Sequence, residues 1–195
     1  MDTPLATVPG RQTLLRTGQP FSRPELAGMV LDGLALPISE GCFVSGTAVV
    51  DARLRARALA ERIPLEARQR VVAGRLSAAW IHGHGVEPGR PVLYIAPGRR
   101  AGALRHGLRA DLHDVRLGSH DVVSLGGLLV TTPLRTALDI ATSLRPELAV
   151  PVLSSMLDHD GSRGLNWRLL RMAVEHAAPP HRRDAALAKV DACLR

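Results

Sequence analysis

The order of the apolar segments most constrains the fold, because short strand-like runs precede longer helix-like runs. Residues 121–133, DVVSLGGLLVTTP, predict a β-hairpin whose turn is Gly126–Gly127. Helices are then expected from Thr132, which can cap the first one with Pro133 in its first turn, and over Pro146–Leu157, Asn166–His176 and His181–Leu194. The chain lacks strand–helix–strand alternation, so this order predicts an α+β fold rather than a doubly wound parallel sheet.

The middle of the chain predicts further strands and two helices. Residues 91–97, PVLYIAP, form its strongest strand pattern, and weaker patterns lie at 70–73 and 108–117. A helix is expected over Asp51–Arg62, with Leu54, Ala58 and Leu59 on its apolar face. A shorter helix over 76–82 would place Ala78, Ala79 and Trp80 inside.

The N-terminal part predicts a smaller segment. Residues 1–20 contain three prolines and no apolar period, so we expect a flexible arm there. Ser22 suits a helix N-cap, Gly33 suits the end of that helix, and a hairpin is expected over 34–46. A helix followed by a hairpin is typical of the end of a winged helix. Residues 21–49 therefore predict a reduced winged-helix-like segment, and residues 50–195 a larger mixed domain.

The composition is that of a folded chain. It has 195 residues, of which 46% are hydrophobic and 22% charged. No apolar run approaches the roughly 18 residues that a membrane span requires. The N-terminus has no signal-peptide pattern, and two cysteines are too few for a disulfide framework. We therefore expect a cytoplasmic protein that does not enter a membrane.

The positive charge is concentrated in the middle of the chain. The formal net charge is +7, and 24 of the 25 basic residues are arginine. Residues 1–50 have a net charge of −1, residues 51–120 of +7 and residues 121–195 of +1. If the chain binds double-stranded DNA, we expect phosphate contacts from Arg53, Arg57, Arg99 and Arg100, and from Arg23 in the first helix. The alternative is that these are solvated arginines of a GC-rich gene.

The common enzyme signatures are absent from the sequence. It has no phosphate-binding loop, nucleophile elbow, His-Glu-x-x-His or Cys-x-x-Cys motif. At Gly161–Ser162 the aspartates precede the pair, whereas a nucleotidyltransferase places them after it. A restriction-type nuclease needs a strand lysine, and the only lysine is Lys189 in a predicted terminal helix. We expect no catalytic residues and no cofactor.

Two clusters could in principle hold a metal. They are His82 with His84, and Asp158–His159–Asp160. The first has no nearby carboxylate or cysteine to complete a zinc site, and the second resembles a solvated loop. We therefore expect no metal, and a hydrolase that uses these residues is the least favoured alternative.

Arg135 and Asp139 are spaced i, i+4 on the helix that Thr132 and Pro133 begin. One interpretation is an ion pair on the helix surface, which contributes a few tenths of a kcal/mol. The other is that Arg135 reaches back to the preceding hairpin and joins the helix to the sheet. We favour a structural role over a functional one.

Several strings resemble the AbiEi family, the antitoxins of type IV toxin–antitoxin systems. They are VVAGRLSAAWIHG, PVLYIAPGRR and HDVVSLGGLLVTTPLRTALDIA, and the similarity covers about residues 50–160. Matching residues include Ser77, Ala78, Ala79, Trp80, Thr131, Thr132, Pro133, Arg135, Thr136 and Asp139.

The resemblance implies an N-terminal winged helix that binds the operator of its own operon. It also implies a C-terminal domain that opposes a nucleotidyltransferase-like toxin. We therefore expect a non-catalytic, antitoxin-like transcriptional regulator that binds DNA mainly through arginines. The alternative is a protein-interaction module without operator binding, because residues 1–50 are slightly acidic and carry no basic recognition helix.

Overall fold

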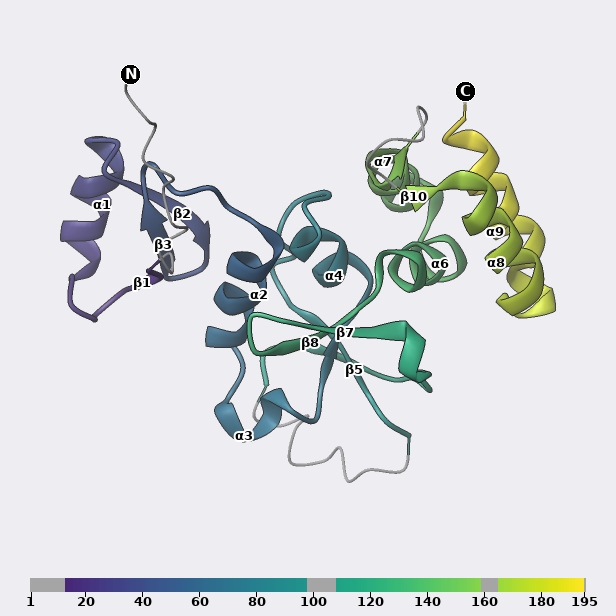
Figure 1. Ribbon diagram of the computed structural model, residues 1–195, viewed down its shortest axis with the longest axis horizontal. Helices are drawn as coiled ribbons and strands as arrows, with labels where there is room; N and C mark the ends of the chain where they lie inside the picture. The colour runs from purple at the N-terminus through teal and green to yellow at the C-terminus, as the bar shows by residue number, and fades with distance from the viewer. Residues whose placement is uncertain (1–12, 98–107, 159–164, 195) are drawn as a thin grey trace, which may run out of the picture. The chain divides into compact units, whose positions relative to one another are not determined.

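A computed structural model describes residues 13–97, 108–158 and 165–194 (Figure 1). The chain divides into two compact units, Met1–Val50 and Asp51–Arg195. Helices lie between the strands in the N-terminal half of the chain, so strands do not simply precede helices, and further helices follow the main sheet; the fold is of the α+β class. Among the described residues, no helix has the length and apolar character that crossing a membrane would require.

The first unit contains one helix and a three-stranded antiparallel sheet. Its elements are β1 (Leu15–Arg16), α1 (Arg23–Leu31), β2 (Ala35–Ser39) and β3 (Cys42–Ser45), and the strand order is β1-β3-β2. Ser22 caps α1 as predicted and forms a reciprocal capping box with Glu25. The predicted hairpin is also confirmed, as β2 and β3.

The prediction of a flexible arm over residues 1–20 is wrong at Leu15–Arg16. These two residues pair with Phe43 and Cys42 of β3, and the backbone N–H of Thr17 donates to the Gly41 carbonyl at 3.0 Å. A strand of two residues has no periodicity of its own. Its conformation depends on the partner strand, which lies far away in the sequence.

The second unit is built around a mixed five-stranded sheet with the order β6-β5-β4-β8-β7. Pairs β4–β8 and β5–β6 are parallel, while β4–β5 and β7–β8 are antiparallel. Its strands are β4 (Val72–Ala73), β5 (Val92–Ile95), β6 (Asp111–Asp114), β7 (Val122–Leu125) and β8 (Leu128–Thr131). The predicted strands and the hairpin are thus confirmed, with shorter bounds.

The helices of this unit follow the predicted order. They are α2 (Ala52–Glu61), α3 (Leu65–Arg68), α4 (Arg75–Ile81), α6 (Pro133–Ser143), α7 (Pro146–Met156), α8 (Trp167–Ala177) and α9 (Pro180–Ala192). A 3-10 turn, η1 (Ser119–Asp121), precedes β7, and two short parallel strands, β9 (Leu157–Asp158) and β10 (Leu165–Asn166), lie between α7 and α8. The short elements α3, η1, β9 and β10 were not predicted.

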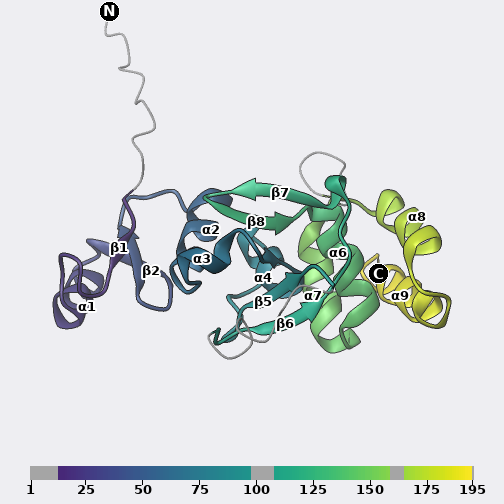
Figure 2. The ribbon, with the colours of Figure 1, turned by 90° about the horizontal axis from the view of Figure 1, so that it is seen from below.

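Helices α6 to α9 gather at one end of the second unit (Figures 1 and 2). Their shared core includes Ile140, Leu153, Leu170 and Val190, all fully buried, and it extends to Ala79 of α4. The only lysine, Lys189, is buried here and donates to the Ala141 carbonyl of α6 at 2.6 Å. Burial lowers the pKa of Lys189.

One detail of α6 differs from the prediction. Thr132 is at the N-cap, but its side chain makes no capping hydrogen bond. On the helix, Leu134 and Leu138 are partly buried, whereas Thr136, Asp139 and Ile140 are buried. Helix α6 therefore directs the polar side chains of Thr136 and Asp139 toward the interior. Their buried hydrogen-bond partners are Thr131 and Tyr94.

The hairpin turn packs directly against α2. Gly126 and Gly127 have φ of +55° and +86°, which the two-residue turn requires. A Cβ at Gly126 would lie within 3.0 Å of the Arg53 carbonyl oxygen, whereas a Cβ at Gly127 would meet nothing within 4 Å. This close approach holds the turn against the helix.

We expect Gly126→Ala to destabilise the chain more than Gly127→Ala. Both substitutions place a side chain in the left-handed region, at a cost of about 1–2 kcal/mol. Gly126→Ala also forces Cβ into α2, which adds about 1–3 kcal/mol. Urea unfolding of both variants measures the difference, and equal losses of stability would contradict this close packing.

Candidate functional site

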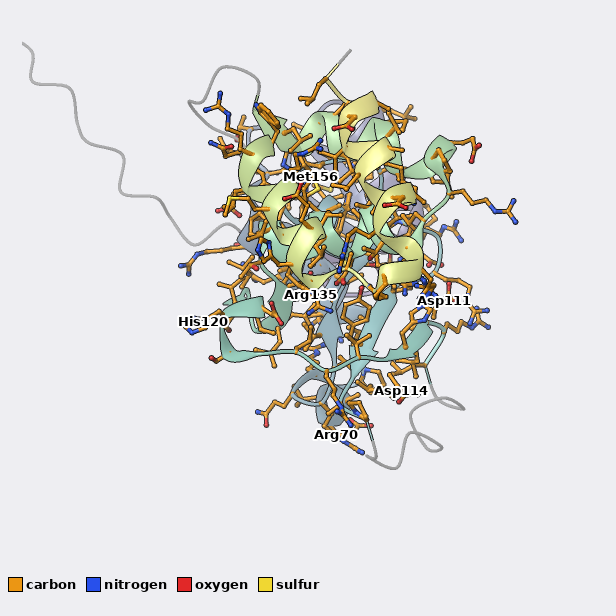
Figure 3. All side chains as sticks on the ribbon, turned by 90° about the vertical axis from the view of Figure 1, so that its right-hand side faces the viewer. Arg70, Asp111, Asp114, His120, Arg135 and Met156 are labelled. Carbon is orange, nitrogen blue, oxygen red and sulfur yellow. The ribbon has the colours of Figure 1, made fainter. Side chains whose placement is uncertain are left out.

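Arg135 of α6 is the centre of a polar network at the junction of helices and sheet. Its Nε donates to Asp139 Oδ1 and Oδ2 at 3.0 and 3.1 Å, and its Nη1 donates to Asp121 Oδ2 at 3.0 Å. Asp121 ends η1 and directly precedes β7. The interpretation that Arg135 joins the helix to the preceding hairpin is therefore confirmed. Figure 3 shows Arg135 below the helices α8 and α9.

Tyr94 of β5 adds a second strand to this network. Its hydroxyl donates to Asp139 Oδ2 at 3.0 Å, and the two residues are 1% and 8% exposed. Burial and the Asp139 carboxylate raise the pKa of the Tyr94 hydroxyl, so it remains a hydrogen-bond donor. Burial also raises the pKa of Asp139, and the hydrogen bonds from Arg135 and Tyr94 oppose that rise. We call Asp121, Arg135, Asp139 and Tyr94 the Arg135 network.

Arg75 packs against the other side of Tyr94. Its guanidinium carbon lies 5.9 Å from the centroid of the Tyr94 ring, and its Nη1 lies 3.2 Å from His113 Nε2. Arg75 has a φ of +46°, which is unusual for a residue other than glycine. Gly74 precedes it, and a Cβ there would meet the Tyr94 ring closer than 3.0 Å. The start of α4 is therefore fitted closely around the tyrosine.

The string TTPLRTALD forms the corner between β8 and α6. Thr131 and Thr136 are fully buried, and their hydroxyl oxygens lie 2.6 Å apart. The backbone N–H of Thr132 donates to the Asp121 carbonyl at 2.8 Å, and Pro133 begins the helix. Trp80 of α4, Thr131, Thr136 and Asp139 are buried, whereas Thr132 and Arg135 are partly buried and Pro133 is exposed. Their hydrogen bonds support a structural role.

The predicted DNA-binding residues are distributed over both units. Arg23 is the first residue of α1 in the first unit, and it is exposed. Arg53 is exposed on α2, whereas Arg57 is half-buried with its Cγ beside Gly126. Arg99 and Arg100 lie outside the described residues.

Several other arginines of the basic region have internal contacts. Arg62 donates to Glu87 at 2.8 Å and to the Gly89 carbonyl at 2.7 Å. Arg68 donates to the Ile63 carbonyl at 3.0 Å. These side chains stabilise the second unit. Fewer arginines can therefore contact a ligand than the formal net charge suggests.

Sequence reasoning missed the role of Tyr94 and the pocket beside Arg70. Tyr94 is the only tyrosine and lies in the strongest strand pattern, but its partner Asp139 is 45 residues away. Arg70 is exposed and lines a pocket with Gln69 and Tyr94. Nothing in the sequence around Arg70 indicates that pocket.

The histidines of the first candidate metal cluster have separate partners. His82 Nε2 lies 2.8 Å from the Thr131 carbonyl oxygen, and His84 Nδ1 lies 2.9 Å from Ser155 Oγ. In the described part of the chain, no group of three or more His, Cys, Asp or Glu side chains could hold a metal ion. His159 and Asp160 of the second cluster lie outside the described residues, as does the Asp158 side chain.

No family model matches the chain, and no curated protein matches it in sequence.

We expect Arg135→Met to destabilise the chain by about 3–5 kcal/mol, because it leaves the buried Asp139 carboxylate without its cation. Arg171→Met is the control, since Arg171 also pairs with two carboxylates, of Glu175 and Asp191, but all three side chains are 40–45% exposed. It should cost less than about 1 kcal/mol. Adding Asp139→Asn to Arg135→Met should recover part of the loss. Urea unfolding measures all three, and a mild effect of Arg135→Met would contradict a central role.

We expect the free energy of unfolding to fall as the pH drops below about 6.5. Burial lowers the pKa of His82 and of His84, and the neighbouring His82 charge lowers that of His84 further. Below the ordinary value of 6.5 the unfolded chain therefore binds more protons than the folded chain. The stabilisation that the two neutral histidines give the folded chain is fully present above pH 6.5.

Urea unfolding between about pH 5.5 and 7.5 measures the slope. His82→Gln should flatten it, because an amide can still donate to the Thr131 carbonyl but does not titrate. The same substitution at His181, which is exposed, is the control. If His82→Gln leaves the slope unchanged, His82 is not a source of the pH dependence of stability.

Proposed function

We propose that the chain is a cytoplasmic, non-catalytic regulator of the antitoxin type that binds double-stranded DNA. The observation that carries the proposal is the topology of the first unit. Helix α1 leads directly into the β2–β3 hairpin, and β1 pairs with β3 to complete a sheet in the order β1-β3-β2. This order of elements resembles the last helix and the wing of a winged helix, and in helix-turn-helix proteins the corresponding helix lies in the major groove.

The exposure of α1 supports this role. Only Leu26 is fully buried, whereas Arg23, Glu25 and Ala27 are exposed. Arg23 is the basic residue of the helix and stands at its N-terminus, the end that contacts base edges in helix-turn-helix proteins. A helix packed on both sides would leave no surface for DNA.

The arginines of the second unit supply a phosphate-binding charge in this proposal. Residues 51–120 have a net charge of +7, and Arg53 and Arg70 are exposed. Such contacts add affinity that falls steeply with salt and does not depend on base sequence. The similarity of the VTTPLRTALDIA string to AbiEi antitoxins further supports pairing with a nucleotidyltransferase-like toxin.

A protein-interaction module is the second candidate. It is favoured by large apolar side chains on the surface of the first unit, where Leu31 is 88%, Leu34 60% and Val49 75% exposed. The net charge of −1 in residues 1–50 also suits a protein partner better than DNA. Under this interpretation the first unit binds protein, and the arginines of the second unit are solvated.

Fluorescence anisotropy on the chain's own upstream DNA and on a scrambled duplex tests the proposal, at about 50 and 200 mM salt. We expect tighter binding to the upstream DNA at both concentrations. Arg23→Ala should remove this preference. Arg53→Ala should weaken binding to both duplexes and reduce the salt slope by about one.

Arg145→Ala is the matched control, because Arg145 is exposed at the start of α7 and is expected to contact no phosphate. Equal binding of both duplexes that disappears at the higher salt would reduce the proposal to phosphate contact alone. If no duplex binds, the interaction module is the function to pursue. Sedimentation of Leu34→Ser against the unchanged chain then tests self-association.

A further inference from the structure

The second unit contains a pocket of about 370 Å³, and the proposed function uses only the exposed charge of Arg70 at its edge, not its apolar lining. Val72, Tyr94 and Leu129 pair in register across the central strands β5, β4 and β8, so they share one face of the sheet. These three residues line the pocket with Gln69, Arg70, Ile95, Ala96, Val115, Leu117, Gly118, Ser119 and Val122. Its volume lies within the range of small-molecule sites, about 300–1,000 Å³.

The lining combines an apolar surface with a small polar group of side chains. Most of the lining side chains are aliphatic, whereas Arg70, Gln69 and Ser119 are polar and exposed. Arg70 forms no side-chain hydrogen bond or ion pair with any described residue. A guanidinium suits a carboxylate because two parallel N–H groups match its two oxygens.

The nearby acids do not cancel this charge. Asp121 is held by Arg135, and its Oδ2 also accepts from the backbone N–H of Gly118 at 2.8 Å. Asp114 is exposed and is not among the lining residues. Figure 3 shows Arg70 and Asp114 at the lower end of this unit, below the C-terminal helices. The pocket therefore offers an apolar surface with one available cation.

We propose that this pocket binds a small carboxylate with an apolar body, with Arg70 holding the carboxylate. The aliphatic lining and the Tyr94 ring would contact the body. This inference goes beyond the proposed function and does not depend on DNA binding.

The position of the pocket indicates what binding would do to the fold. Tyr94 lines the pocket and donates to Asp139, while Gly118 lines it and donates to Asp121. A bound molecule would thus contact the Arg135 network directly at Tyr94 and, through Gly118, at Asp121. Because it binds only the folded state, it should also raise the unfolding temperature.

Isothermal titration of the full chain with 2-naphthoate tests the proposal, with neutral 2-naphthamide as the matched ligand. We expect 2-naphthoate to bind about tenfold more tightly than the amide, because only the acid pairs with Arg70. Arg70→Gln should remove this difference and leave the affinity for the amide unchanged. Arg145→Gln, an exposed arginine outside the pocket, should bind both ligands as the unchanged chain does.

Val122→Phe provides a second variant, because a larger side chain at this partly exposed position fills the apolar surface. It should abolish binding of both ligands while circular dichroism shows an unchanged fold. The proposal is overturned if 2-naphthoate does not bind, if the amide binds equally well, or if Arg70→Gln or a folded Val122→Phe leaves the affinity for the acid unchanged. Each of these outcomes leaves the DNA-binding proposal standing.

Discussion

The ion pairs of one partly buried arginine connect the sheet of the second unit to its helices. Arg135 binds Asp139 on its own helix and Asp121 at the start of the hairpin, and Asp139 also accepts from Tyr94 in the middle of the sheet. Burial alone would make the Asp139 carboxylate costly, so the charge needs the guanidinium and the hydroxyl together. Helix α6 can direct Asp139 inward only because the Arg135 guanidinium and the Tyr94 hydroxyl are both present. Helices α7, α8 and α9 in turn pack against α6.

The use of arginine as an internal hydrogen-bond donor also changes how the positive charge of the chain is interpreted. Arginine has five donors, so in this chain it serves to hold carbonyl and carboxylate oxygens as well as to carry charge. Arg62, Arg68 and Arg135 are committed to such contacts. The formal charge of the second unit therefore overstates its affinity for phosphate, and the exposed Arg53 and Arg70 are the residues to follow.

Local signals predicted the elements well. The Ser22 cap, the Gly126–Gly127 turn and Pro133 at the start of α6 each act through their immediate neighbours, and each is confirmed. The predictions failed where a partner is distant. Leu15–Arg16 forms a strand only because β3 is present, and Thr132 makes no side-chain cap because the corner is already held by its backbone contact to Asp121.

By itself, the sequence determined the α+β class, the order of the longer elements and the pairing of Arg135 with Asp139, because periodicity, turn residues and i, i+4 spacing are local properties. The partnership of Tyr94 with Asp139 and the pocket beside Arg70 were decided only by the tertiary structure. The reason is physical: the pocket depends on strand register, which brings together residues from β4, β5 and β8, and the hydrogen bond joins β5 to α6 across 45 residues of sequence. Register sets which side chains share a face, and no short segment contains that information.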